Sequence, residues 1–94
     1  MAKIGYARVS TRDQNLDLQL VALEKAGCEK VYSEHKSGLK ARLELAEAIK
    51  YLRKGDTLVV YKFDRLGRSL RDLLNIISEL HEKGVSIQSL KDNI

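Results

Sequence analysis

Four strand-like runs alternate with three helix-like segments along this chain, and the alternation restricts the fold more than any other feature. The strand-like runs are KIGYARV (3–9), EKVYSE (29–34), DTLVVYKF (56–63) and VSIQSL (85–90). The segments between them, 16–27, 43–55 and 70–84, space their apolar residues as one helix face and end in glycine. Strands that alternate with helices form right-handed βαβ units around a parallel sheet. We therefore predict an α/β fold: an open, mainly parallel sheet of about four strands with helices on both faces.

Composition sets limits on the class of protein. A chain of 94 residues is long enough for one hydrophobic core. Its 17 basic and 13 acidic side chains give a net charge of +4, which fits a polyanionic partner without requiring one. The single Cys28 excludes an internal disulfide. The sequence has neither a run of about 20 apolar residues nor a signal-peptide core, so we expect a cytoplasmic protein without a membrane partner.

The segment 70–84 is the clearest helix in the sequence. Its apolar side chains follow the i, i+3, i+4, i+7 rule of one helix face: Leu70, Leu73, Leu74, Ile77 and Leu80. Ser69 stands directly before the first of them. We therefore predict that Ser69 is the N-cap of this helix and that Asp72 completes a capping box.

The strand exit DRLGRS carries an unusual set of charges at a place where open parallel sheets bind ligands. Arg65, Arg68 and Arg71 recur at every third position. If they share the first turn of the helix, they project from neighbouring positions, where free N–H groups and the helix dipole already attract anions. The planar guanidinium group donates two hydrogen bonds at once to phosphate. Solvated arginines beside a helix cap are the alternative, but positive charge at this end opposes the dipole, and the pattern favours a phosphate site.

A second exit, RVSTRDQ, places a serine close to an arginine. Helix capping explains the hydroxyl groups if Ser10 pairs with Asp13, or Thr11 with Gln14. Alternatively, Ser10 is a nucleophile. In that case Arg8, which points to the same side of the strand, stabilises an alkoxide and binds phosphate oxygens. No Ser-His-Asp arrangement is evident, because neither histidine lies in a motif loop.

Three stretches, YARVSTRDQNLDLQL, SGLKAR and LRKGDTLVVYKFDRLGRSLRDL, resemble the N-terminal catalytic domain of serine recombinases of the resolvase/invertase group. The resemblance runs along almost the whole chain and keeps the spacing between the motifs. It implies that Ser10 attacks a DNA phosphodiester and leaves a 5′-phosphoserine link and a free 3′ hydroxyl. Arg8, Arg65 and Arg68 then match family arginines that bind and stabilise the scissile phosphate. Asp64 matches the acidic residue of the family's DRLGR element.

The same resemblance implies further site residues. Arg42 matches the arginine of the loop before the second helix, although ARLEL stands here where many members read DRPGL. Gln14 and Gln19 match recurrent glutamines near the site. Independently of the resemblance, the spacing of the arginines makes Arg71 a supporting candidate for phosphate binding. No cofactor and no metal are expected. A serine ester conserves the phosphodiester energy without ATP, and arginines supply the charge that metal ions give to nucleases.

Residues 1–94 are expected to be a single N-terminal catalytic domain that lacks the family's dimerisation helix and helix-turn-helix DNA-binding domain. The full-length protein would bind double-stranded DNA as a homodimer or tetramer. The fragment alone is compatible with a monomer and is not expected to recombine DNA. Two alternatives stay open: a non-catalytic α/β module that binds phosphate or nucleic acid, and an inactive truncated remnant. The joint presence of Arg8, Ser10, Asp64, Arg65 and Arg68 favours a recombinase over the first alternative but not over the second.

Overall fold

A computed structural model of the chain describes residues 2–9, 16–35, 43–67 and 69–92. The elements follow the predicted alternation and are, in chain order, β1 (Lys3–Val9), α1 (Leu16–Lys25), β2 (Lys30–His35), α2 (Leu43–Tyr51), β3 (Thr57–Val60), the 3₁₀ helix η1 (Phe63–Arg65), α3 (Leu70–Glu82) and β4 (Ser86–Ser89). β3 is shorter than the run 56–63, because the end of that run leads into η1. Within these ranges, no helix is both long enough and apolar enough to cross a membrane.

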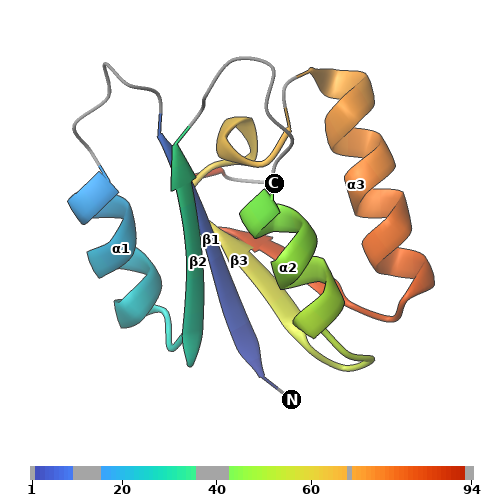
Figure 1. The fold of residues 1–94 in the computed structure, drawn as a ribbon, viewed down its shortest axis with the longest axis horizontal. Helices are drawn as coiled ribbons and strands as arrows, with labels where there is room; N and C mark the ends of the chain where they lie inside the picture. Colours follow the sequence, from blue (N-terminus) through green and yellow to red (C-terminus); the bar gives the residue numbers. More distant parts are fainter. Residues whose placement is uncertain (1, 10–15, 36–42, 68, 93–94) are drawn as a thin grey trace.

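The four strands form one parallel sheet in the order β2-β1-β3-β4, and helices cover both of its faces (Figure 1). Side chains along β1 alternate between these faces. Ile4 and Tyr6 pack in the core cluster under α2 and α3, whereas Ala7 packs on the other face with Val59 of β3 and Leu23 of α1. All five side chains are fully buried. The predicted α/β fold is therefore confirmed.

α3 turns a narrower face to the core than its leucine spacing predicts. Leu80 is completely buried and Ile76 is 7% exposed, but Leu70 and Leu74 are 72% and 55% exposed. α3 packs beside β4, which is the edge strand of the sheet. A helix at a sheet edge has core on one side only, so one flank of its apolar stripe extends past the edge into solvent.

The topology brings the two unusual strand exits together. From β1 the chain passes through α1 to β2 on one side, and from β2 it passes through α2 to β3 on the other side of β1. Ligands of open α/β sheets bind at such a reversal, outside the carboxyl ends of the strands. Here β1 pairs directly with β3, and the exit of β3 continues into η1 above the strand ends (Figure 1). The DRLGR segment therefore lies where the fold predicts a ligand site.

Candidate active site

Arg8 joins the carboxyl end of β1 to the turn that follows β3. Its side chain is only 7% exposed. The terminal nitrogen Nη2 donates hydrogen bonds to the carbonyl oxygen of Asp64 at 2.9 Å and to that of Gly67 at 3.2 Å. Hydrogen bonds from a charged donor are stronger than those between neutral groups, so these acceptors offset part of the desolvation of the guanidinium. Arg8 thereby fixes the DRLGR turn against the strand that leads to Ser10.

The turn itself is compact and packs closely on α3. Leu66 is completely buried, and the N–H groups of Leu66 and Gly67 donate to the carbonyl of Phe63 at 2.9 and 3.2 Å. A Cβ atom added at Gly67 would lie 2.7 Å from Cβ of Leu73 and 2.8 Å from its Cα. Glycine is therefore needed here because the backbone of the turn touches the first turns of α3.

Arg65 and Arg71 do not share one helix turn. Arg65 ends η1, whereas α3 begins only at Leu70. Ser69 separates the two and is the N-cap of α3, since its Oγ accepts a hydrogen bond from the N–H of Asp72 at 3.1 Å. The predicted N-cap is confirmed. Arg71 is in the first turn of α3.

Gln19 reaches from α1 to the same end of β1. Its side chain is completely buried, and Nε2 donates a hydrogen bond to the carbonyl oxygen of Arg8 at 3.3 Å. A carbonyl only accepts, so the amide nitrogen must face it and Oε1 must point away. Among the residues that the structure describes, Oε1 has no hydrogen-bond partner. Gln19 thus anchors the peptide group that follows Arg8, and its Oε1 is a buried acceptor available for a further hydrogen bond.

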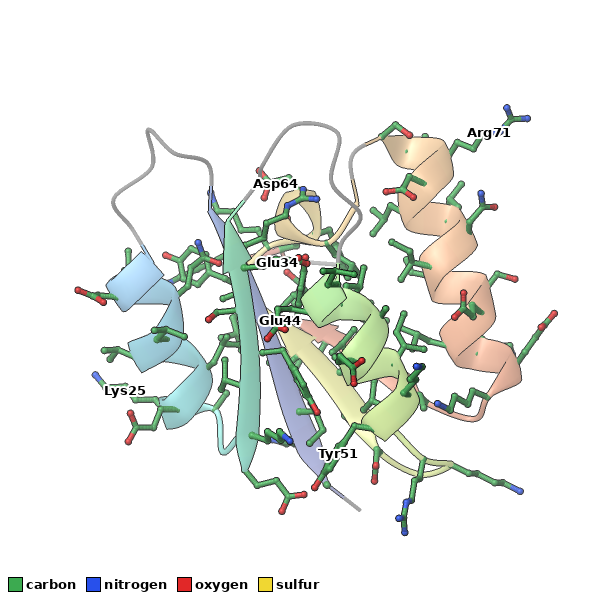
Figure 2. The ribbon with its side chains drawn as sticks, viewed as in Figure 1. Lys25, Glu34, Glu44, Tyr51, Asp64 and Arg71 are labelled. Atoms are coloured by element: carbon green, nitrogen blue, oxygen red, sulfur yellow. The ribbon has the colours of Figure 1, made fainter. Side chains whose placement is uncertain are left out.

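Glu34 belongs to the same end of the sheet, although sequence reasoning does not select it. It lies directly opposite Arg8 in the β1–β2 register and accepts a hydrogen bond from the hydroxyl of Tyr6. Figure 2 shows Glu34 and Asp64 at the carboxyl ends of the strands. The sequence does indicate Glu34: it is an acidic residue near the end of a strand that runs parallel to the strand bearing Arg8. Tyr6 is fully buried and also positions this carboxylate.

A hollow of about 290 Å³ adjoins the turn. It opens beside the exposed Asp64, and its lining comes from η1, the turn and the start of α3: Phe63, Asp64, Gly67, Ser69, Leu70 and Leu73. Polar groups of the turn and apolar groups of α3 therefore meet in one concave surface next to the residues that Arg8 holds.

The structure describes only some of the other predicted site residues. Ser10, Gln14, Arg42 and Arg68 lie outside the described residues, and Arg65 is placed by its backbone only. Arg71 is exposed and points outward from α3, away from Asp64 and Glu34 (Figure 2). In the described part of the chain, no three histidine, cysteine or acidic side chains gather as a metal site would require. The structure thus brings together Arg8, Gln19 and Asp64 from the predicted set.

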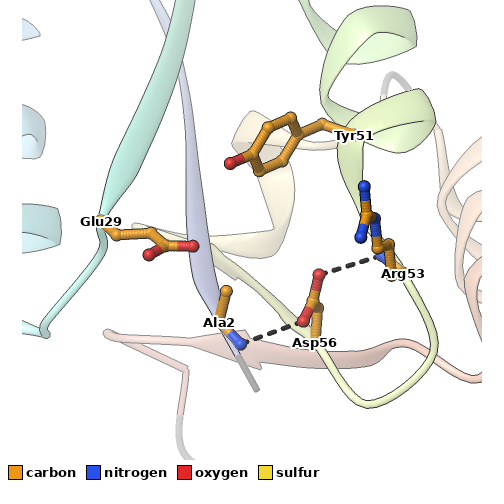
Figure 3. A pocket seen from close by; sticks show the side chains of 5 residues that line it. All are labelled: Ala2, Glu29, Tyr51, Arg53 and Asp56. Atoms are coloured by element: carbon orange, nitrogen blue, oxygen red, sulfur yellow. Dashed lines mark hydrogen bonds between the residues drawn. The ribbon is translucent and has the colours of Figure 1, made fainter.

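A second pocket, of about 400 Å³, lies at the opposite end of the sheet. It is lined by Ala2, Glu29, Tyr51, Arg53 and Asp56 (Figure 3). Asp56 accepts hydrogen bonds from the backbone N–H groups of Ala2 at 3.0 Å and Arg53 at 2.9 Å, and these bonds lower the pKa of its carboxyl group. Asp56 thus closes the loop between α2 and β3 and has no contact with the candidate site.

Known recombinases are similar to this chain over nearly all of its length. It is 56% identical over 95 residues to the DNA-invertase hin of Salmonella typhimurium, 54% over 93 residues to the transposon Tn552 DNA-invertase BinR of Staphylococcus aureus, and 53% over 92 residues to the serine recombinase gin of Escherichia phage Mu. These alignments cover 97% to 100% of this chain but 48% to 50% of the relatives. The chain spans about half the length of the curated relatives it matches.

Solved structures share the fold. A resolvase family site-specific recombinase from Streptococcus pneumoniae has a TM-score of 0.81 at 22% identity, over 100% of this chain and 75% of that chain. The C-terminal catalytic domain of ISC1926 TnpA, an IS607-like serine recombinase, has a TM-score of 0.78 at 24% identity, over 99% and 69%. Residues 3–94 match the family model of the resolvase N-terminal domain, and the chain therefore belongs to the resolvase N-terminal domain family.

Proposed function

We propose that this chain is the catalytic domain of a site-specific DNA recombinase that cleaves and rejoins strands through a 5′-phosphoserine intermediate. The observation that carries the proposal is the pair of hydrogen bonds from Arg8 to the carbonyl oxygens of Asp64 and Gly67. Arg8 and Asp64 are 56 residues apart in the sequence. The two bonds hold the strand that leads to Ser10 against the DRLGR turn, which supports a single site built from the two motifs. Family membership supports the same chemistry.

In the proposed reaction, Ser10 Oγ attacks the phosphorus atom of a DNA phosphodiester. The Oγ–P bond forms, the bond from phosphorus to the 3′ oxygen breaks, the hydroxyl proton of Ser10 passes to a base, and the 3′ oxygen takes up a proton. Rejoining reverses these steps: the 3′ hydroxyl of a second strand attacks the phosphoserine and frees Ser10. One phosphate ester replaces another at each step, so the reaction needs no external energy source.

The proposed site residues have two roles in this reaction. The transition state gathers negative charge on the phosphate oxygens, and preorganised cationic donors stabilise that charge. Arg65 and Arg68 are the proposed donors, because both belong to the DRLGR motif. Arg8 holds the turn in place and brings a positive charge to the exit of β1, and Gln19 fixes the carbonyl of Arg8.

Recombination at a specific site requires more protein than this chain. Phosphate contacts position a protein on DNA, whereas contacts to base edges specify the sequence. We therefore propose that the chain acts in a longer protein that adds a dimerisation helix and a helix-turn-helix domain and binds double-stranded DNA as a dimer or tetramer. Arg42 is proposed to join the catalytic residues in that assembly, and Gln14 and Arg71 are proposed to support phosphate binding.

The proposal is tested with a chimera that joins this chain to the second half of the Salmonella DNA-invertase. The chimera is incubated with a labelled recombination site, and the reaction is stopped under denaturing conditions that preserve a protein–DNA ester. We expect a covalent adduct whose digestion leaves phosphate on Ser10. Ser10→Ala should abolish this adduct.

Ser78→Ala is the matched control, because Ser78 is exposed on α3 and far along the helix from the turn. It should form the adduct at the parental rate. An adduct that persists in Ser10→Ala would refute the proposed nucleophile. A chimera that binds the site with the parental affinity of the invertase but never forms an adduct would identify the chain as a binding module or remnant.

A further inference from the structure

η1 has no capping side chain of its own. Lys62 precedes it with an extended backbone, and the side chain of Lys62 makes no capping hydrogen bond. The N–H group of Phe63 instead donates to Oδ2 of Asp92 at 2.8 Å, from 29 residues away in the sequence. A carboxylate is favourable at a helix N-terminus because it accepts from unpaired N–H groups and opposes their partial positive charge. Asp92 therefore caps η1 from the exit of β4.

The carboxylate of Asp92 is itself held in place. Ser89 Oγ donates to Oδ2 of Asp92 at 2.6 Å and accepts from the Asp92 N–H at 3.3 Å. The pairing of β3 and β4 also continues past the strands, because the N–H groups of Leu90 and Lys91 donate to carbonyls at the exit of β3, each at 3.0 Å. The hydroxyl of Ser89, the N–H of Phe63 and the charge of Lys62 lower the pKa of Asp92, in keeping with an ionised cap.

We propose that Asp92 is a positioning residue of the candidate active site. Arg8 binds the turn from β1 at the carbonyls of Asp64 and Gly67, and Asp92 binds it from β4 at the N–H of Phe63. The two contacts hold η1 and the residues after it between two strand exits. Asp92 thus sets the orientation of the residues that η1 carries, Asp64 and Arg65. This inference rests on the proposed function, since it assigns Asp92 to that reaction.

The structural reason for such a residue is the small size of η1. A 3₁₀ helix of three residues has one turn and little stability of its own. Groups that stabilise a transition state must be held close to their productive geometry, because a displacement of about 1 Å can reduce a rate by about a hundredfold. Asp92 supplies stiffness that the local sequence of the turn does not.

The test compares Asp92→Ala with Asp56→Ala in the chimera. Asp56 is a matched control because it too accepts two hydrogen bonds, both from backbone N–H groups, but it lies at the opposite end of the sheet. We expect Asp92→Ala to slow cleavage of bound DNA by about tenfold or more, with DNA affinity within about twofold of the parent. Asp56→Ala should leave the cleavage rate unchanged, and Asp92→Asn, which keeps an acceptor oxygen, should restore part of the rate.

Amide exchange and chemical shifts provide a readout that does not depend on catalysis. In this chain, Asp92→Ala should speed hydrogen exchange at the N–H of Phe63 but not at that of Leu73, which donates to the carbonyl of Ser69 at 2.9 Å. Parental cleavage by Asp92→Ala, or equal slowing by Asp56→Ala, would overturn the positioning role. If Asp92→Ala does not fold, Asp92→Asn and the Phe63 amide signal decide the same question. Persistence of the adduct in Ser10→Ala would instead refute the proposed function, and the exchange result would still stand.

Discussion

Gly67→Ala is expected to destabilise the chain because the new methyl group has no room. Its Cβ would lie 2.7, 2.8 and 2.9 Å from Cβ, Cα and N of Leu73, at least about 0.5 Å inside ordinary van der Waals contact. None of these atoms moves with a side-chain rotamer, so the turn and α3 must separate. Overpacking of this kind costs about 2 kcal/mol, which corresponds to a decrease of about 10 °C in Tm for a domain of this size.

Urea unfolding followed by circular dichroism measures the change. Gly27→Ala is the control: its Cβ would meet only Cδ of Lys3 at 3.9 Å, so its penalty of about 1 kcal/mol comes from the backbone, at φ +92. In the chimera, Gly67→Ala should also slow cleavage, because the carbonyl of Gly67 accepts from Arg8. Gly27→Ala should not. A free energy of unfolding for Gly67→Ala within about 0.5 kcal/mol of the parent would refute the steric reasoning.

Three further predictions follow from buried and capping groups. Gln19→Leu removes the hydrogen bond to the Arg8 carbonyl but also removes Oε1, which has no partner among the described residues. The free energy of unfolding should therefore change by less than about 1 kcal/mol, while adduct formation slows. An unchanged rate of adduct formation would contradict a positioning role for Gln19. The bonds to Asp56 lower its folded-state pKa below the ordinary 3.8, so they stabilise the chain above that pH and the stabilisation is lost as the pH falls through the folded-state pKa. Asp56→Asn should therefore be less stable than the parent at pH 7, and the difference should shrink below about pH 4, as measured by urea unfolding. Burial raises the pKa of the Cys28 thiol, so iodoacetamide at pH 8 should label it more slowly in the folded chain than in urea, and equal rates would contradict this.

The fold could be predicted because local and global patterns in this sequence agree. Each strand-like run and each helix segment is present, and glycines close the helices at Gly27, Gly55 and Gly84, all with positive φ. The burial of α3 could not be predicted from its spacing alone. The leucine pattern identifies an apolar stripe, but the position of α3 at the sheet edge decides that Leu74 is exposed and Ile76 is buried.

The site was predictable in its location but not in its contacts. Strand exits could be identified from the sequence, yet Arg8 binds backbone carbonyls, and every residue carries one, so no sequence pattern marks them. The spacing of the arginines could not locate the start of the helix, because a spacing of three continues from Arg65 in η1 to Arg71 in α3 although two separate elements carry them. Gln19 had a clearer signal, since it is a polar residue within the leucine-rich sequence of α1.

The geometry of the DRLGR turn comes from three separate elements rather than from its own sequence. β1 contributes the guanidinium of Arg8, β4 contributes the carboxylate at its exit, and α3 contributes the close packing against Gly67. Because β1 and β4 are strands of one sheet, with only β3 between them, their ends hold a fixed relation to each other. A turn attached to both takes its orientation from the rigid sheet, which allows a short and otherwise unstable segment to carry residues that must be accurately placed. The same attachment means that a substitution of Asp92 should displace the turn, although Asp92 belongs to a different strand exit.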